Sequence, residues 1–233
     1  MKWDDNIINS LDWGKDISRR EEKEKVAGLI AGMVEDGNRL GIGSGSTSYL
    51  ALVKIAERIH NEGLRIKAIA TSLEITMACA RLGVSITGLE SDRPDWTFDG
   101  ADEIDPQLNL IKGRGGAMFK EKLLINASPK TYIIADRSKI VERLGSKFPV
   151  PVEIFPQALT YVSHALKREL KPREIKLRMA EGKDGPLITE NGNLILDVWF
   201  DFIPNEAEKA IKQITGVIES GLFMGYPVTI LNP

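Results

Sequence analysis

Residues 96–105 read WTFDGADEID, a short run of strand-forming residues that leads into four carboxylates around one glycine. Three other polar segments also begin where an expected strand ends: GIGSGSTS at 41–48, TSLEIT at 71–76 and ADRSK at 135–139. Strands that alternate with helices predict an α/β fold, a Rossmann-like parallel sheet with helices on both faces. The four segments would then meet at the carboxyl edge of the sheet, where open α/β sheets bind ligands.

Hydrophobic spacing assigns the other elements around this sheet. Ser18 with Glu21 three residues later is typical of a capping box that starts a helix, and Asp36–Gly37 ends that helix. Further helices are expected at Tyr49–His60, from TSLEIT to Leu82 and at Met118–Asn126, and strands at Ile66–Ala70, Val84–Leu89, Trp96–Phe98 and Thr131–Ala135.

The pattern changes after Gly145. Strands are expected at Val152–Phe155, Ile175–Met179, Leu187–Thr189 with Leu194–Phe200 as a hairpin, and Val217–Phe223, and helices at Gln157–Leu170 and Glu206–Ile214. This β-α-β-β-α-β order is typical of a smaller ferredoxin-like α+β domain. We therefore predict a main α/β domain of residues 1–145 with 224–233, to whose sheet Val228–Leu231 could return, and a small domain of residues 146–223.

Composition limits the possible partners. The 233 residues are 42% hydrophobic and 27% charged, with a net charge of -2 and no basic stripe, so nucleic acid is not expected as a partner. The apolar runs are too short to span a membrane, and the N-terminus has no apolar segment typical of a secretory signal. Cys79 is the single cysteine, which suits a reducing compartment, and we expect a cytoplasmic protein.

The segment GIGSGSTS is a candidate phosphate cradle. Ser46 stands where a dinucleotide fingerprint needs its last glycine, and no Gly-Lys-Ser/Thr follows as in a P-loop. The glycine amides, three hydroxyls and a helix N-terminus could still bind a phosphate. A tight strand–helix turn with nothing bound explains the segment equally well.

The acidic turn and KGRGGAMFKEK, Lys112–Lys122, together supply the groups for proton transfer on a small anion. Carboxylates accept protons, and a lysine before a glycine-rich turn can stabilise developing negative charge. A solvated acidic turn and a surface lysine are the alternatives, and a magnesium site is another for the acidic turn, although its spacing does not fit an EF-hand loop. Neither His60 nor His164 lies in a motif, which disfavours a histidine-based mechanism.

Taken together, GIGSGST, Thr71-Ser72, DGADEID, KGRGGA with the following EK, and ADRSK resemble ribose-5-phosphate isomerase of the A type. The resemblance runs in order from about Gly41 to Phe223 and includes KFPVPVEIFP, NGNLILDV and GVIESGLF. It implies an aldose–ketose isomerase that interconverts D-ribose 5-phosphate and D-ribulose 5-phosphate through an enediolate, in the non-oxidative pentose phosphate pathway. It also implies a homodimer or homotetramer without a metal or other cofactor.

The resemblance assigns roles to individual residues. Glu121 matches the catalytic base, Asp99 and Asp102 the acidic pair that assists ring opening, and Lys112 the lysine that stabilises the negative charge. The expected substrate contacts are Ser44, Gly45, Ser46, Thr47, Asp99, Gly100, Ala101, Asp102, Lys112, Gly113, Arg114, Gly115 and Lys139.

Three positions depart from the family pattern, and two other functions stay open. Ser44 replaces a threonine, Arg114 replaces a glycine, and Met118-Phe119-Lys120 replaces Leu-Thr-Arg. Arginine would be strained at Arg114 if that position required a positive φ. A non-catalytic sugar-phosphate-sensing domain would need a helix-turn-helix segment, and none is visible. A coenzyme A transferase would need a glutamate-bearing signature that we do not find. The segment up to about Asp16 lies outside the match and receives no role.

Overall fold

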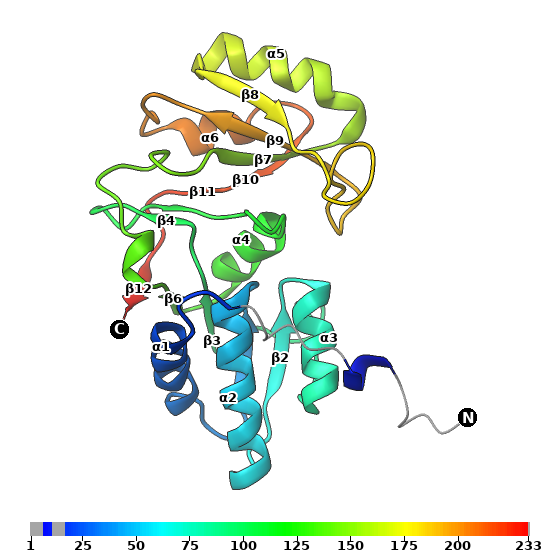
Figure 1. Ribbon diagram of the computed structural model, residues 1–233, viewed down its shortest axis with the longest axis vertical. Coiled ribbons are helices and arrows are strands. Elements are labelled where there is room, and N and C mark those ends of the chain that lie inside the picture. Colours follow the sequence, from blue (N-terminus) through cyan, green and yellow to red (C-terminus); the bar gives the residue numbers. More distant parts are fainter. Residues whose placement is uncertain (1–6, 11–16, 233) are drawn as a thin grey trace. The chain divides into compact units, whose positions relative to one another are not determined.

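The computed structural model describes residues 7–10 and 17–232, and these form two compact units (Figure 1). The first unit takes the chain up to Gly100, then Leu123–Arg137, and the end from Val228. The second unit takes Ala101–Lys122 and Ser138–Pro227. The domains expected from the sequence, residues 1–145 with 224–233 and residues 146–223, stay a prediction. Of the N-terminal segment, residues 1–6 and 11–16 lie outside the described residues, and Ile7–Ser10 form a 3-10 helix, η1.

The first unit is built on a parallel five-stranded sheet in the order β12-β6-β3-β1-β2, which confirms the expected α/β class. The last strand of the chain returns to this sheet beside β6, as its apolar sequence suggested. The strands are β1 (Arg39–Ile42), β2 (Lys67–Ala70), β3 (Trp96–Asp99), β6 (Thr131–Ile134) and β12 (Val228–Leu231), and the helices are α1 (Arg20–Gly32), α2 (Ser46–Glu62), α3 (Leu73–Leu82) and the later part of α4 (Met118–Ala127).

Helices cover both faces of this sheet. Leu40, Ile42 and Phe98 lie in one buried cluster with α1 and α2, which run side by side (Figure 1). Gly41 faces the opposite way, and a Cβ there would lie 2.9 Å from a methyl group of Leu124 in α4. The inner strands β1, β3 and β6 therefore bury residues on both of their faces, whereas the edge strands β2 and β12 stay partly exposed.

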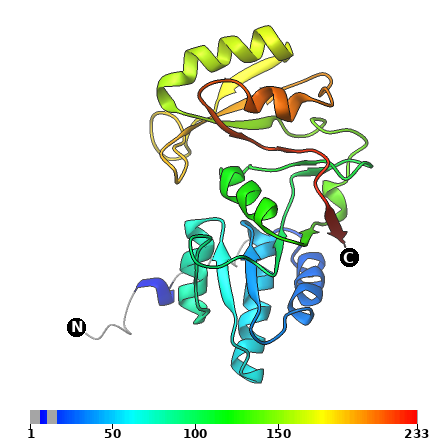
Figure 2. The same ribbon diagram turned by 180° about the vertical axis from the view of Figure 1, so that it is seen from behind.

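The second unit contains an antiparallel sheet in the order β10-β7-β9-β8 (Figure 2). Alternate residues of β7 and β9 pack with α5 and α6 in a second buried cluster. The order β7-α5-β8-β9-α6-β10 confirms the expected ferredoxin-like unit. The elements are β7 (Val150–Ile154), η3 (Pro156–Ala158), α5 (Leu159–Leu170), β8 (Glu174–Leu177), β9 (Leu194–Trp199), α6 (Ala207–Lys212) and β10 (Val217–Ser220).

A three-stranded sheet in the order β11-β5-β4, which the sequence did not predict, completes the second unit. Its strands are β4 (Glu103–Ile104), β5 (Leu110–Ile111) and β11 (Leu222–Phe223). Gly221 divides the single strand expected at Val217–Phe223, because β10 pairs with β7 whereas β11 pairs with β5. The Gly221 N–H donates to Pro151 O, and its carbonyl accepts the N–H of Lys112. A Cβ at Gly221 would lie 2.1 Å from Lys112 O, so only glycine allows this crossing.

Two other expected strands were wrong. Val84–Leu89 makes only a single bridge, between Ile86 and Ala68, because the Gly88 carbonyl accepts the N–H groups of Ser91 and Asp92 and turns the chain. Leu187–Thr189 is not a strand either. Instead, a tight turn joins Thr189 to Asn193, which confirms the turn but not the hairpin.

The start of α1 also differs from the prediction. Arg19, with a φ of 52°, occupies the N-cap position without a side-chain capping bond, so the expected Ser18–Glu21 capping box is wrong. Arg19 Nη1 instead lies 2.9 Å from Asp136 Oδ1. By contrast, Ser72 caps α3 and accepts the N–H of Ile75.

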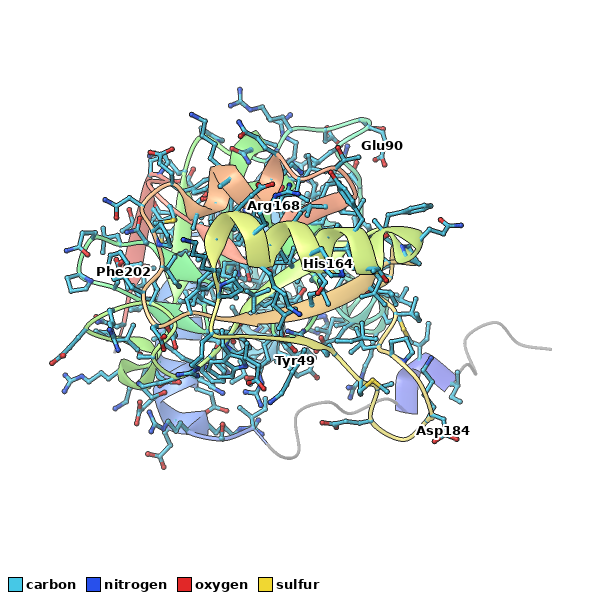
Figure 3. All side chains as sticks on the ribbon, turned by 90° about the horizontal axis from the view of Figure 1, so that it is seen from above. Tyr49, Glu90, His164, Arg168, Asp184 and Phe202 are labelled. Atoms are coloured by element: carbon cyan, nitrogen blue, oxygen red, sulfur yellow. The ribbon has the colours of Figure 1, made fainter. Side chains whose placement is uncertain are left out.

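Two sequence features need no functional role. Cys79 is fully buried in α3, and this burial raises the pKa of its thiol to about 12. His60 and His164 are both exposed, and Figure 3 shows His164 on α5 near Arg168. Among the described helices, none combines the length and apolarity that crossing a bilayer requires.

Candidate active site

The first group of site residues lies at the carboxyl edge of the parallel sheet. Asp99 ends β3 with 1% of its surface exposed, and its Oδ1 accepts the N–H of Gly100 at 2.7 Å. Gly43 follows β1, and its N–H donates to Phe98 O. A Cβ at Gly43 would lie 2.0 Å from the Asp99 carboxyl, so the glycine is what allows this buried acid beside the turn.

The turn after Gly43 leads into α2. Gly45 has a φ of +89° and forms the N-cap of the helix. The Ser44 hydroxyl lies 2.8 Å from the Thr71 hydroxyl, which comes from the next strand–helix turn. Ser44, Ser46 and Thr47 are all half-buried. A helix N-terminus with several hydroxyls is a suitable site for an anionic group.

Lys23 belongs to the same group, although sequence reasoning missed it. Its Nζ donates to Ser46 Oγ at 2.9 Å, and the residue is only 9% exposed. Lys23 lies on the buried face of α1 with Val26, Ala27 and Ile30. A lysine on the apolar stripe of a helix was the available signal, because a buried ammonium needs a specific partner.

The second group of site residues belongs to the second unit. Lys112 and Glu121, 3% and 5% exposed, form an ion pair with 3.2 Å between Lys112 Nζ and Glu121 Oε2. Glu121 lies in the first turn of α4, and its N–H donates to Ala117 O. The Lys112 ammonium also lies 5.7 Å from the centre of the Phe223 ring. A carboxylate and a cation are therefore buried side by side, nine residues apart in sequence.

The loop between Lys112 and Glu121 carries the next contacts. The N–H of Arg114 donates to Asp102 Oδ2 at 3.1 Å. Gly113 and Gly116 take positive φ values, whereas Arg114 does not, so the arginine that replaces the family's glycine is not strained. The Arg114 guanidinium and the Lys139 ammonium lie 5.7 and 5.6 Å from the centre of the Phe148 ring. Both cations therefore gather at one aromatic side chain.

The other two carboxylates of the acidic turn have structural roles. Glu103 is fully buried and accepts the N–H groups of Gly145, Lys147 and Phe148. Asp105 accepts those of Gln107 and Asn109. Of the four acids, Asp99 and Asp102 thus remain the candidates for chemistry. Gly100 and Ala101, which separate them, stand at the division between the units.

A cavity of about 540 Å³ borders the lysine–glycine loop within the second unit. Asp102 and Arg114 lie in its wall together with Phe148, Arg178 and Asp197. Within residues 7–10 and 17–232, no group of three or more histidine, cysteine or acidic side chains is arranged to hold a metal ion.

This geometry defines a class: an α/β protein with a glycine- and hydroxyl-rich turn at the carboxyl edge of a parallel sheet and a buried lysine–glutamate pair. Residues 67–232 match the model of the family described as ribose 5-phosphate isomerase A (phosphoriboisomerase A). The chain belongs to this family, whose curated relatives are aldose–ketose isomerases.

The relatives match over most of their length. The ribose-5-phosphate isomerase A of Methanothermobacter thermautotrophicus is 40% identical over 87% of this chain and 89% of its own. That of Synechococcus is 44% identical over 90% and 91%. The solved ribose 5-phosphate isomerase A of Methanocaldococcus jannaschii has a TM-score of 0.87 at 38% identity, covering 91% of this chain and 95% of its own. A D-ribose-5-phosphate isomerase in complex with phospho-erythronic acid has a TM-score of 0.86 at 33% identity, covering 92% and 95%.

Proposed function

We propose that this chain, an aldose–ketose isomerase of the ribose 5-phosphate isomerase A family, interconverts D-ribose 5-phosphate and D-ribulose 5-phosphate with Glu121 as the base. The observation that carries the assignment is the buried pair of Glu121 and Lys112. Isomerisation moves one proton between neighbouring carbons and builds negative charge on oxygen. A carboxylate beside an ammonium supplies a proton acceptor and a charge partner at one place.

The reaction begins with ring opening, in which Asp99 or Asp102 transfers the proton of the ring hydroxyl. Glu121 then removes the proton from the carbon beside the aldehyde and returns it to the former aldehyde carbon, while Lys112 stabilises the enediolate. Only two residues separate Asp99 from Asp102, so chain length alone keeps their Cα atoms within about 11 Å of each other.

The phosphate would bind at the N-terminus of α2. Gly45 and the hydroxyls of Ser44, Ser46 and Thr47 present donors there, and Lys23 adds a positive charge that touches Ser46. A dianionic phosphate is favoured by a helix N-terminus and a buried ammonium together. Lys139, Gly113, Arg114 and Gly115 are further proposed substrate contacts, with Gly100 and Ala101 beside the acids.

The test of this assignment is a coupled isomerase assay of the purified chain, run also in D₂O. Proton transfer through Glu121 places solvent deuterium on the reacting carbon, whereas a hydride shift does not. Glu121→Gln should lower kcat by about 10²–10⁴-fold, because the amide accepts no proton. Glu57→Gln, an exposed glutamate on α2, is the matched control.

Binding separates the enzyme from a non-catalytic sugar-phosphate sensor, which the family assignment does not favour. Phospho-erythronic acid should inhibit the wild type competitively and still bind Glu121→Gln. A chain that binds this compound but shows no turnover would return the sensor hypothesis. Full turnover by Glu121→Gln would remove Glu121 as the base.

We further propose that the enzyme needs no metal, works in the cytoplasm in the pentose phosphate pathway, and forms a homodimer or homotetramer. Full activity in EDTA is expected, and a loss that magnesium restores would contradict it. Cell fractionation and light scattering test the location and the number of subunits.

A further inference from the structure

The loop that separates Lys112 from Glu121 is short of side chains that could fix it. Three of its residues, Gly113, Gly115 and Gly116, are glycines, which have the largest conformational freedom of all residues. The N–H of Gly116 donates to Gly113 O at 3.0 Å and closes one turn. Gly221 O holds the N–H of Lys112, so the placement of the Lys112 ammonium against Glu121 depends further on what contacts the backbone of the loop between them.

Arg178 makes that contact. It follows β8 directly, and its backbone is fixed because its N–H donates to Ile195 O and its carbonyl accepts the N–H of Leu187. The two protons of its Nη1 go to loop carbonyls, at 3.0 Å to Gly113 O and 2.9 Å to Arg114 O. The side chain is 15% exposed. A cation thus binds two neighbouring carbonyls of the glycine loop with charge-assisted bonds.

Asp197 orients this guanidinium from the other side. Nε of Arg178 donates to Asp197 Oδ2 at 2.9 Å, and Nη2 donates to Asp197 Oδ1. Asp197 lies on β9, in the sheet face opposite α5 and α6, together with Ile195. The planar fork of arginine serves both partners at once, which the ammonium of a lysine cannot do.

The loop is also fixed at its other edge, where the N–H of Arg114 donates to Asp102. The loop thus contacts Asp102 through the N–H of Arg114 and contacts Arg178 through the carbonyls of Gly113 and Arg114. We propose that Arg178, oriented by Asp197, is a positioning residue that holds the lysine–glycine loop and so places the Lys112 ammonium beside Glu121. The proposal rests on the proposed function, because it assigns the effect on turnover to Lys112.

The test compares Arg178→Ala with Arg173→Ala. Arg173 lies at the other end of β8, and its pair with Asp201 is 3.6 Å long and mostly exposed, so its removal should leave kcat within about 2-fold. Arg178→Ala should lower kcat by about 10–100-fold, because a shift of about 1 Å in a reacting group has that effect. KM should change less than kcat, because the proposed phosphate contacts at the start of α2 are untouched and only the proposed contacts of the loop that Arg178 holds are loosened.

Two further readouts separate positioning from a general structural role. In a Lys112→Met background, Arg178→Ala should cost less than about 3-fold more, because the group that it positions is already absent. Added guanidinium should restore part of the kcat of Arg178→Ala, since the cavity of about 540 Å³ lined by Asp197 opens beside the vacated place. Additive losses, or equal kcat values for the Arg178 and Arg173 variants, would overturn the proposal.

A measurement without turnover keeps this result apart from the proposed function. Relaxation of the Gly113, Gly115 and Gly116 amides by NMR should show greater mobility in Arg178→Ala than in Arg173→Ala. If the wild type has no isomerase activity, the proposed function fails. Unchanged mobility of the three glycines in Arg178→Ala would by itself overturn the positioning role of Arg178. Arg178→Lys, which keeps the charge without the fork, carries the same measurements if the alanine variant does not fold.

Discussion

The second unit buries two lysines against the same aromatic ring, yet it surrounds them differently. Lys112 and Lys122 are 3% and 4% exposed, and their ammonium groups lie 5.7 and 4.6 Å from the centre of the Phe223 ring. Lys122 donates to Glu208, Glu219 and the carbonyl of Leu222. Lys112 pairs with Glu121, at the start of a helix that follows a glycine loop.

The difference lies in what the acceptors do. Glu208, Glu219 and Leu222 lie in α6, β10 and β11. Lys122 therefore joins three elements of the second unit. Glu208 also accepts the N–H of Met224 and the hydroxyl of Tyr226. Burial alone therefore does not distinguish Lys112, the proposed catalytic lysine, from Lys122, and the partners of each lysine must also be known. The same substitution at both positions tests this distinction.

Lys122→Met should have the largest effect on stability. Removal of one partner from a buried ion pair leaves charges without compensation and costs about 3–5 kcal/mol. We expect this decrease in the free energy of unfolding, measured by urea denaturation, with a much smaller change in kcat for the variant that still folds. A variant as stable as the wild type would show that the contacts of Lys122 with α6, β10 and β11 do not stabilise the fold.

Lys112→Met should have the opposite profile. Loss of one group that stabilises an oxyanion costs about 2.7–4 kcal/mol of transition-state stabilisation, or about 10²–10³-fold in kcat. Its stability should also decrease, but less than that of Lys122→Met, because Lys122 joins three separate elements, α6, β10 and β11. Matching losses of stability in the two variants, with kcat falling in parallel, would remove the distinction between the lysines.

Much of the fold followed from the sequence because local patterns and tertiary structure agree. The helix expected from TSLEIT to Leu82 is α3, and Val228–Leu231 returns to the sheet as its apolar residues suggested. Gly221 did not reveal that it separates two strands, since that depends on the close approach of Lys112. The start of α1 was mispredicted: Arg19 takes the N-cap position, and its side chain pairs with Asp136, more than a hundred residues away.

The site was predictable to the extent that its residues lie in contiguous motifs. Glu121 and Lys112 come from one segment, and the structure pairs them. Lys23 and Arg178 each lie far in sequence from the loops that they contact, Ser46 and the Gly113–Arg114 carbonyls. A single lysine in a helix or arginine after a strand has no local pattern, so such contacts emerge only from the fold.

The pH dependence of stability tests the contribution of Lys122 through its partner Glu219. Burial alone raises the pKa of this carboxyl, but the Lys122 ammonium, the N–H of Ser220 and Lys212 outweigh it and place the folded-state pKa below the usual 4.5. Such a group stabilises the fold above its unfolded-state pKa, and this contribution is lost as the pH falls through the folded-state pKa.

Glu219→Gln should therefore destabilise the protein at pH 7 by about 1–3 kcal/mol, the cost of weakening a buried charged hydrogen bond. The difference from the wild type should begin to shrink below pH 4.5. Thermal melts of both proteins between pH 7 and pH 3 measure it. A difference that stays constant over this range would show that the carboxyl does not titrate with folding.

Arg114→Gly should have the smallest effect and concerns a cation near Lys112 that is exposed rather than buried. The N–H that donates to Asp102 is retained in glycine, so the loop keeps this bond. What is lost is the guanidinium beside Phe148, and exposed contacts of this type contribute about 0.5–1 kcal/mol. If Arg114 also attracts the anionic substrate, KM should rise about 2–5-fold with kcat unchanged, and the rise should diminish with added salt. Arg114→Lys, which keeps the charge, should recover most of the KM. An unchanged KM at low salt would show that the arginine contacts the ring alone and has no part in substrate binding.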